Sequence, residues 1–508
     1  MTENVQTFNA TSSTNSQIKV DPARVLAAVD PRIYSGFVEH LGRCVYTGIV
    51  DYDNKNHNLV NENGFRVDVG EALKKLNMPI VRYPGGNFVS NYHWLDGVGP
   101  KENRPKKIDP AWNASEPNLF GTDEFIEWCE YMNVEPYLCL NMGSGTLEEA
   151  LAWLEYCNLE TDTYYANLRR KNGHEKAYKV KYWGLGNELW GTGIVGRTDA
   201  EEYSKKAEQW ARSLKLVDPS IQLISCGFSG CDDWDRTVVK ALIPFIDLHS
   251  LHMYTYHDDH YRNAIQPLAA ERSIQITAKL LELAKITAGI PESKANIAFD
   301  EWNVWNMADP NPGLEQKYTL SDALAFTTWL HVFVRQAAHL GMANIAQCVN
   351  VIAPIISNQQ GIFLQTIFHP FRLFSEHMQG KSLALHVASP AFEGSLGEKN
   401  DYLSWLRDSQ ADIPLLNVSA TLNGKSVTVA VTNISLDEDF ETEIQLEGQY
   451  KSSVKKWLLY HDDINAINSF EHPDKVKLIE SNVNISSNRP RLTFSKHSFT
   501  MLQFELRE

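Results

Sequence analysis

The stretch KYWGLGNE, residues 181–188, is an apolar run that ends in an amide and a carboxylate, Asn187 and Glu188. Its aromatic and aliphatic residues are typical of a buried strand. A second run of the same form, NIAFDEW at 296–302, carries Glu301 near its end. A single polar residue at a strand end is often only solvated. Two such ends raise the question of whether the fold brings the two carboxylates together.

Six further short apolar runs accompany these two along the chain. They are IYSGFVEH (33–40), IVRYPGG (80–86), EPYLCLNM (135–142), IQLISC (221–226), IDLHSLHMY (246–254) and NIAQCVNV (344–351). Segments with helical spacing separate them; in 198–218, for example, apolar residues recur every three or four positions. Strands that alternate with helices predict a parallel sheet. Eight such units predict an α/β fold of the (β/α)8 TIM-barrel type, with an open doubly wound sheet as the alternative.

The sequence pattern changes near residue 385. Residues 420–447 alternate polar and apolar side chains around the turn signal Asn423-Gly424, which is typical of antiparallel strands. We therefore expect three regions: an N-terminal segment at 1–30, the catalytic barrel at 31–385, and an antiparallel β-sandwich of jelly-roll type at 386–508. The N-terminal segment begins as a polar tail, and its residues 16–30 have strand character. We expect these strands to join the sandwich.

Charge and cysteine content exclude several classes of function. The 508-residue chain has 47 basic and 63 acidic residues, a net charge of −16, which disfavours binding to nucleic acid or to an anionic membrane. No apolar run is long enough to span a membrane, and the polar start lacks the apolar core of a secretory signal. Seven cysteines without a CxxC pair fit a reducing compartment. We expect a cytoplasmic protein; five N-x-S/T sequons keep secretion as an alternative.

The two glutamates indicate glycoside hydrolysis. The C-terminal ends of barrel strands form one face, where catalysis takes place, so Glu188 and Glu301 are expected to converge there. A retaining glycosidase needs one carboxyl group to protonate the leaving oxygen and a second to attack the anomeric carbon. Asn187 precedes Glu188, and its amide can hold a sugar 2-hydroxyl. Glu188 is therefore the predicted acid/base, and Glu301 the predicted nucleophile.

Other strand ends supply further polar groups to the same face. In chain order, the run 33–40 supplies Glu39, and the run 80–86 with the residue after it supplies Arg82, Gly85, Gly86 and Asn87. The run 246–254 supplies His252 and Tyr254, and the run 344–351 supplies Gln347. The glycine pair permits a tight turn or a close approach of the backbone. A phosphate-binding loop is excluded, because the GxxxxGK[ST] spacing is absent.

The segment HSLHMYTYHDDH, residues 249–260, has the composition of a metal site. However, strand alternation places His249 on the face opposite to His252. No HExxH motif occurs, and no cysteine lies nearby. We therefore expect no metal here, and we expect His252 and Tyr254 to line the pocket. A metallohydrolase stays an alternative.

Several segments together resemble one family, the α-L-arabinofuranosidases of glycoside hydrolase family 51. They are GFVEHLGR, VRYPGGNFVSNYHW, YWGLGNE, LHMY, FDEWNVW and AQCVNVIAPI, and the resemblance covers essentially the whole chain. It implies release of terminal non-reducing α-L-arabinofuranosyl residues from arabinan, arabinoxylan and arabino-oligosaccharides, by an exo-acting, retaining enzyme. It also implies no metal or other cofactor, and a homo-oligomer.

The same resemblance assigns roles to residues around the two glutamates. It implies that the furanose is held, or the carboxylates are ordered, by Glu39, Arg82, Asn87, Asn187, His252, Tyr254 and Gln347, and that Trp112 packs near the substrate. Two alternatives stay open besides the metallohydrolase. A β-xylosidase or an endo-β-1,4-glucanase of the same clan would share both glutamates. A non-catalytic carbohydrate-binding protein would not need them to converge.

Overall fold

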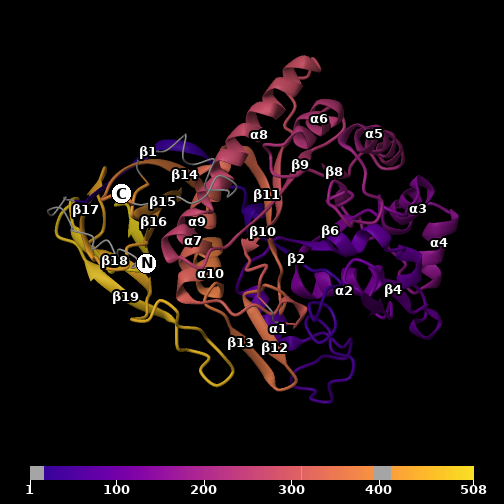
Figure 1. The fold of residues 1–508 in the computed structure, drawn as a ribbon, viewed down its shortest axis with the longest axis horizontal. Coiled ribbons are helices and arrows are strands. Elements are labelled where there is room, and N and C mark those ends of the chain that lie inside the picture. Colours follow the sequence, from indigo (N-terminus) through magenta and orange to yellow (C-terminus); the bar gives the residue numbers. More distant parts are fainter. Residues whose placement is uncertain (1–15, 310–311, 394–412, 508) are drawn as a thin grey trace, which may run out of the picture.

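A helix-covered barrel lies beside a sheet-rich domain in the computed structural model, which describes residues 16–309, 312–393 and 413–507 (Figure 1). The barrel is closed by eight parallel strands in the order β10-β11-β2-β3-β6-β7-β8-β9. They are β2 (Ser35–Phe37), β3 (Ile80–Tyr83), β6 (Glu135–Cys139), β7 (Tyr182–Leu185), β8 (Gln222–Ser225), β9 (Leu248–Thr255), β10 (Asn296–Val304) and β11 (Leu340–Ala346). The predicted TIM barrel is confirmed, and the open doubly wound sheet is wrong.

Helices surround the outside of the barrel. In α5, Tyr203, Ala207, Trp210 and Leu214 are buried, and Asp199 caps the first turn by accepting a hydrogen bond from the backbone of Glu202. The helices are α1 (Val67–Lys74), α2 (Thr122–Met132), α3 (Leu147–Asn158), α4 (Tyr164–Lys171), α5 (Ala200–Val217), α6 (Asp233–Leu242), α7 (His260–Ile265), α8 (Leu268–Thr287), α9 (Leu320–Arg335) and α10 (Phe368–His377). No described helix is both long and apolar enough to cross a bilayer.

The interior of the barrel is filled by side chains from seven of its strands. This buried cluster consists of Ile80, Tyr137, Tyr182, Ile224, Leu248, Ala298 and Met342. Such packed layers are typical of TIM barrels, whose interior is a core and not a pore. A substrate therefore has to approach from the loops at the strand ends.

The second domain is a nine-stranded sheet in the order β19-β18-β21-β16-β15-β14-β1-β17-β20. Its strands are β1 (Ser16–Ala28), β14 (Lys381–Ala388), β15 (Leu416–Asn423), β16 (Ser426–Asn433), β17 (Phe440–Leu446), β18 (Ser453–Leu459), β19 (Leu478–Asn484), β20 (Arg491–Phe494) and β21 (Ser498–Glu505). Apolar side chains from eight of its strands, all except β19, share one core. A continuous sheet can enclose one core only by folding over on itself, which gives the domain its sandwich character.

Two details differ from the expected division of the chain. The boundary expected between residues 385 and 386 falls inside β14, because this strand belongs to the sheet from Lys381 onward. Indigo β1 lies beside orange β14 in Figure 1, and it pairs with β14 antiparallel but with β17 parallel. The sheet is therefore not antiparallel throughout. The polar tail expected at the start of the chain lies outside the described residues up to residue 15.

Two short hairpins complete the described strands. One consists of β4 (Lys107–Asp109) and β5 (Ala114–Glu116), and the other of β12 (Ile355–Asn358) and β13 (Gly361–Leu364). The β4–β5 hairpin is inserted between β3 and α2, and Trp112 lies in its turn. This hairpin brings an aromatic side chain to the C-terminal face of the barrel.

Candidate active site

Glu188 lies in the loop that follows β7, and its backbone is strained. Its φ angle is 44°, in the left-handed region that side chains other than glycine rarely adopt. The preceding Gly186 also has a positive φ, of 81°. Strained residues persist only where the surrounding structure holds them, and they cluster at functional sites. Here the sharp turn follows directly from the end of a barrel strand.

Glu301 lies inside β10, at an irregularity of the strand. The register of β10 shifts against β9 between Ala298 and Glu301, and against β11 between Phe299 and Trp302. A bulge of this kind changes the direction of the side chains that follow it. In a regular strand, Asp300 and Glu301 would point to opposite faces of the sheet. Here both side chains contact the same guanidinium group, that of Arg82.

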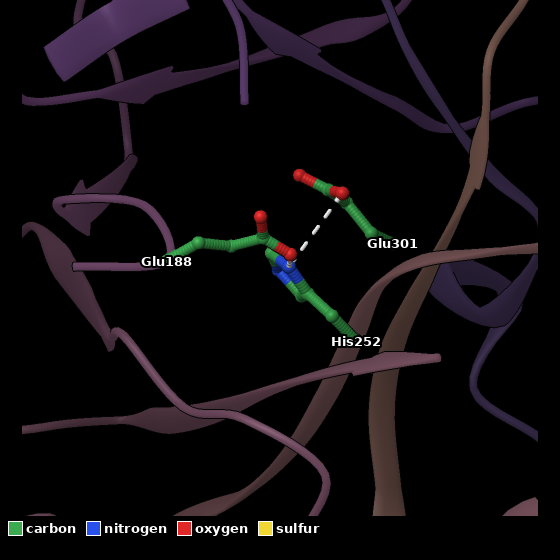
Figure 2. Close-up of side chains that lie close together, drawn as sticks. All are labelled: Glu188, His252 and Glu301. Carbon is green, nitrogen blue, oxygen red and sulfur yellow. Dashed lines mark hydrogen bonds and ion pairs between the residues drawn. The ribbon is translucent and has the colours of Figure 1, made fainter. Parts of the chain in front are cut away.

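The imidazole of His252 lies between the two glutamates (Figure 2). Its Nδ1 atom is 2.9 Å from Oε1 of Glu188 and 3.5 Å from Oε2 of Glu301. Burial alone would lower the pKa of His252, but the charge of Glu301 and the contacts of the ring with Asp300 and Glu188 raise it to about 10. At neutral pH the group is therefore an imidazolium, which pairs with carboxylates on both of its nitrogen atoms.

Arg82 and Tyr254 fix the two oxygens of Glu301. Arg82 Nη1 donates to Oε1 at 2.7 Å, and the hydroxyl of Tyr254 donates to Oε2 at 2.8 Å. Arg82 Nη2 also donates to Oδ1 of Asn187 at 2.5 Å, and Nδ2 of Asn187 donates to Oδ1 of Asn87 at 3.0 Å. One charged donor, Arg82, and one neutral donor, Tyr254, thus stabilise Glu301 as an anion with a fixed orientation.

Glu39 is held by groups from the segments that follow β3 and β11. Its Oε1 accepts from the backbone of Phe88 and from Nε1 of Trp112, both at 3.0 Å. Its Oε2 accepts from Nε2 of Gln347 at 3.1 Å, and the Glu39 backbone donates to the Gln347 side chain at 3.1 Å. Burial and the charge of Glu301 raise the pKa of Glu39 to about 8, against these donors. Glu39 therefore takes up a proton far more readily than an exposed carboxylate.

The backbone at Gly85 and Gly86 lies directly against these carboxylates. A Cβ atom added at Gly86 would lie 2.8 Å from Oε1 of Glu301 and 3.3 Å from Oε2 of Glu39. A Cβ atom at Gly85 would lie 2.9 Å from Cγ of Glu39. The close approach expected from the glycine pair is present, and it shapes the floor of the site.

The structure places all ten predicted site residues together at the carboxyl ends of the barrel strands, in two adjacent hydrogen-bonded groups. It also adds Asp300, which sequence reasoning missed. Alternation along FDEW places Asp300 on the face opposite to Glu301, and only the bulge in β10 turns both inward. The adjacent acidic pair Asp300-Glu301 was the one signal that could have pointed to it.

The four histidines of the segment 249–260 do not converge on one point. His249 contacts Ser225 and Asp235, and His260 contacts Ser321. His257 lies in the loop that precedes α7, and of the four only His252 reaches the glutamates.

One group of metal-binding side-chain types is found among the described residues: Glu188, His252 and Glu301, with one atom of each within 4.8 Å of the others. Nδ1 of His252 lies 2.9 Å from Oε1 of Glu188 and 3.5 Å from Oε2 of Glu301. The three residues form a charge-paired triad.

Comparisons with known proteins agree with this site. Two family models match the chain: the α-L-arabinofuranosidase 1 domain at residues 72–271 and the α-L-arabinofuranosidase C-terminal domain at residues 300–498. The chain is 48% identical to probable α-L-arabinofuranosidase C of Aspergillus terreus, over 96% of this chain and 97% of the relative. It is 35% identical to intracellular exo-α-(1→5)-L-arabinofuranosidase 1 of Bacillus subtilis, over 96% and 98%. The crystal structure of Thermotoga maritima α-L-arabinofuranosidase in complex with arabinose has a TM-score of 0.87 at 36% identity, over 97% of this chain and 100% of that chain.

The barrel, the paired glutamates and these matches define a glycoside hydrolase. The chain belongs to the α-L-arabinofuranosidases of glycoside hydrolase family 51, and its resemblance to that family is confirmed. It is an enzyme with α-L-arabinofuranosidase activity. A non-catalytic binding protein is therefore wrong. A β-xylosidase, an endo-β-1,4-glucanase and a metallohydrolase find no support in these matches.

Proposed function

We propose that the enzyme releases terminal non-reducing α-L-arabinofuranosyl residues from arabinan, arabinoxylan and arabino-oligosaccharides by a retaining double displacement. The observation that carries the proposal is the separation of the glutamates: an oxygen of Glu188 lies within 4.8 Å of an oxygen of Glu301. Retaining glycosidases place the two carboxyl groups about 5–5.5 Å apart, whereas inverting enzymes leave about 6.5–9.5 Å for a water molecule. The name of the Bacillus relative supports exo action.

The surroundings of the two glutamates support different roles. Glu301 is fixed on both oxygens by Arg82 and Tyr254, as a nucleophile that must stay ionised and aimed. The side chain of Glu188 is more exposed, at 16% against 8% for Glu301. A group that meets leaving groups and then water needs this access. Glu188 is therefore the acid/base, and Glu301 the nucleophile.

The reaction then proceeds in two inversions. Glu188 protonates the glycosidic oxygen while the Glu301 carboxylate attacks the anomeric carbon, which forms a covalent arabinofuranosyl-enzyme and releases the alcohol. Glu188, now a carboxylate, takes a proton from water, and that water displaces Glu301 from the anomeric carbon. The hydroxyls of the furanose are held by Glu39, Asn87 and Asn187, with Trp112 and Gln347 keeping Glu39 in place.

Substrate class is tested by comparing three substrates with the wild-type enzyme. We expect kcat/KM for 4-nitrophenyl α-L-arabinofuranoside to exceed that for the β-D-xylopyranoside by at least about a hundredfold, because a site built around furanose hydroxyls leaves polar groups unpaired with another ring. Carboxymethylcellulose should give no turnover. Preference for the xyloside or the glucan would contradict the proposal. Loss of the arabinofuranosidase activity in a chelator would restore the metallohydrolase alternative.

Two further expectations concern the protein as a whole. We propose a cytoplasmic location, which the word intracellular in the name of the Bacillus relative supports. We also propose a homo-oligomer, which light scattering on the purified protein measures directly. The net charge of −16 continues to disfavour nucleic acid and anionic membranes as partners.

A further inference from the structure

We propose that Asp300 is a positioning residue for the hydrolysis, whose carboxylate holds the two cations that contact Glu188 and Glu301. This inference rests on the proposed roles of the two glutamates and adds a third carboxylate to the site. Asp300 is only 1% exposed, and it follows Phe299 at the bulge of β10. It acts through His252 and Arg82, and not on the sugar.

The two oxygens of Asp300 face two different cations. Oδ1 lies 3.3 Å from Nε2 of His252, and Oδ2 lies 3.7 Å from Nε of Arg82. The hydroxyl of Tyr137 donates to Oδ2 at 2.8 Å, and the hydroxyl of Ser250 donates to Oδ1. Neutral donors from β6 and β9 thus fix the carboxylate, while its charge is directed at the cations.

The two nitrogens that face Asp300, Nε2 of His252 and Nε of Arg82, are buried. Neither Nε2 of His252 nor Nε of Arg82 makes a hydrogen bond of good geometry in the described part of the chain. Burying a cation without a counter-charge is costly. The negative charge of Asp300 therefore offsets the burial of both cations on this side.

The opposite ends of the same two cations contact the paired glutamates. Nδ1 of His252 lies 2.9 Å from Glu188, and Nη1 of Arg82 donates to Glu301 at 2.7 Å. One buried carboxylate thus connects the acid/base to the nucleophile through two bridges. The imidazolium also stabilises the Glu188 carboxylate that remains after its proton has passed to the leaving oxygen.

The charge states agree with this arrangement. Burial alone would raise the pKa of Asp300, but Arg82, His252 and the hydroxyl of Ser250 hold it well below its usual range. Asp300 is therefore an anion at neutral pH. The charged groups that face His252 are Asp300 and Glu301 from β10 and Glu188 from the loop after β7.

The variant that tests the proposal is Asp300→Asn, which keeps the size of the side chain and removes its charge. We expect kcat on 4-nitrophenyl α-L-arabinofuranoside to fall by about a hundredfold, with KM changed less than about threefold, as for other residues that orient a catalytic group. A kcat within threefold of wild type would overturn the proposal.

A second readout, independent of turnover, is the NMR titration of the His252 imidazole in protein labelled at histidine. In wild type we expect the ring to stay protonated past pH 9, because its pKa is about 10. In Asp300→Asn, one of the carboxylates that raise the pKa of His252 is gone, while burial still lowers it. The pKa of His252 should therefore be about one to three units lower than in wild type. An unshifted titration, with Glu301→Gln still inactive, would overturn this inference and leave the proposed function standing.

The matched control is Asp123→Asn. Asp123 is also a buried carboxylate that accepts from tyrosines, Tyr156 and Tyr178, and lies 3.7 Å from a histidine, His174, but in the outer helix layer. This control should lower Tm without lowering kcat. If both variants lost kcat in proportion to their decrease in Tm, the role of Asp300 would be merely structural, and the proposal would be contradicted.

If Asp300→Asn does not fold, Tyr137→Phe provides the same test with a milder change, because it removes one donor to Asp300. We expect kcat to fall about three- to tenfold. The pKa of His252 should also be lowered, as in Asp300→Asn. No change in either quantity would overturn the proposal.

Discussion

Replacing Glu301 with Gln or Ala is expected to lower kcat/KM on every substrate by about four orders of magnitude or more, as removal of a nucleophile does in other enzymes. The amide cannot attack the anomeric carbon as an anion, although it can keep the contacts of Glu301 with Arg82 or Tyr254. Affinity of Glu301→Gln for an arabino-oligosaccharide, measured by calorimetry, should stay within about tenfold of the wild-type KM. Residual activity above a few per cent would show that the nucleophile lies elsewhere.

A matched control separates this loss from a loss of folding. Glu271 also forms an ion pair with an arginine, Arg335, at 2.8 Å, but between α8 and α9. Glu271→Gln is expected to lower Tm with kcat/KM within about twofold of wild type, because this pair lies away from the strand ends. A comparable loss of activity in both variants would mean that Glu301 acts only through stability.

Replacing Glu188 with Ala is expected to affect substrates according to their leaving groups. For arabino-oligosaccharides, whose leaving alcohol needs a proton, kcat/KM should fall by about 10²–10⁴-fold, the usual contribution of a general acid. For 2,4-dinitrophenyl α-L-arabinofuranoside, whose leaving group needs none, kcat/KM should fall less than about tenfold. Kinetics on a series of aryl arabinofuranosides measures this difference. A uniform loss across the series would contradict the acid/base role.

Added azide distinguishes the two glutamates by the configuration of the product. In Glu188→Ala, azide enters from the side of the missing acid/base and displaces Glu301, so the product should be the α-L-arabinofuranosyl azide. In Glu301→Ala, azide takes the place of the missing nucleophile, and a single inversion should give the β-azide. NMR of the isolated azides reads the configuration. The same anomer from both variants, or no azide from Glu188→Ala, would contradict the assignment.

Much of the barrel could be predicted from the sequence because its strands are buried on both faces. Runs such as 181–188 and 296–302 are then almost continuously apolar, and polar residues mark where they end. Once the barrel is assumed, the position of Glu188 after the fourth strand and of Glu301 in the seventh places them on one face. The separation of His249 from His252 followed equally from strand alternation, and the structure places them in different surroundings.

The remaining features of the fold and the site could not be predicted, because they depend on irregularities that the regular spacing of residues in strands and helices does not reveal. The bulge in β10 turns Asp300 inward, and a strict period of two assigns this residue to the wrong face. The contact of Trp112 with Glu39 comes from a hairpin inserted in a long loop, and the parallel pairing of β1 with β17 comes from contacts far apart in sequence. Such long-range contacts are set by packing, which local residue patterns do not determine.

The central claim is that Glu188 and Glu301 carry out a double displacement with net retention. The most direct measurement is proton NMR of the first product formed from 4-nitrophenyl α-L-arabinofuranoside with methanol as the acceptor. Two successive inversions predict methyl α-L-arabinofuranoside as the initial product. Initial formation of methyl β-L-arabinofuranoside would mean a single displacement, and it would contradict the account.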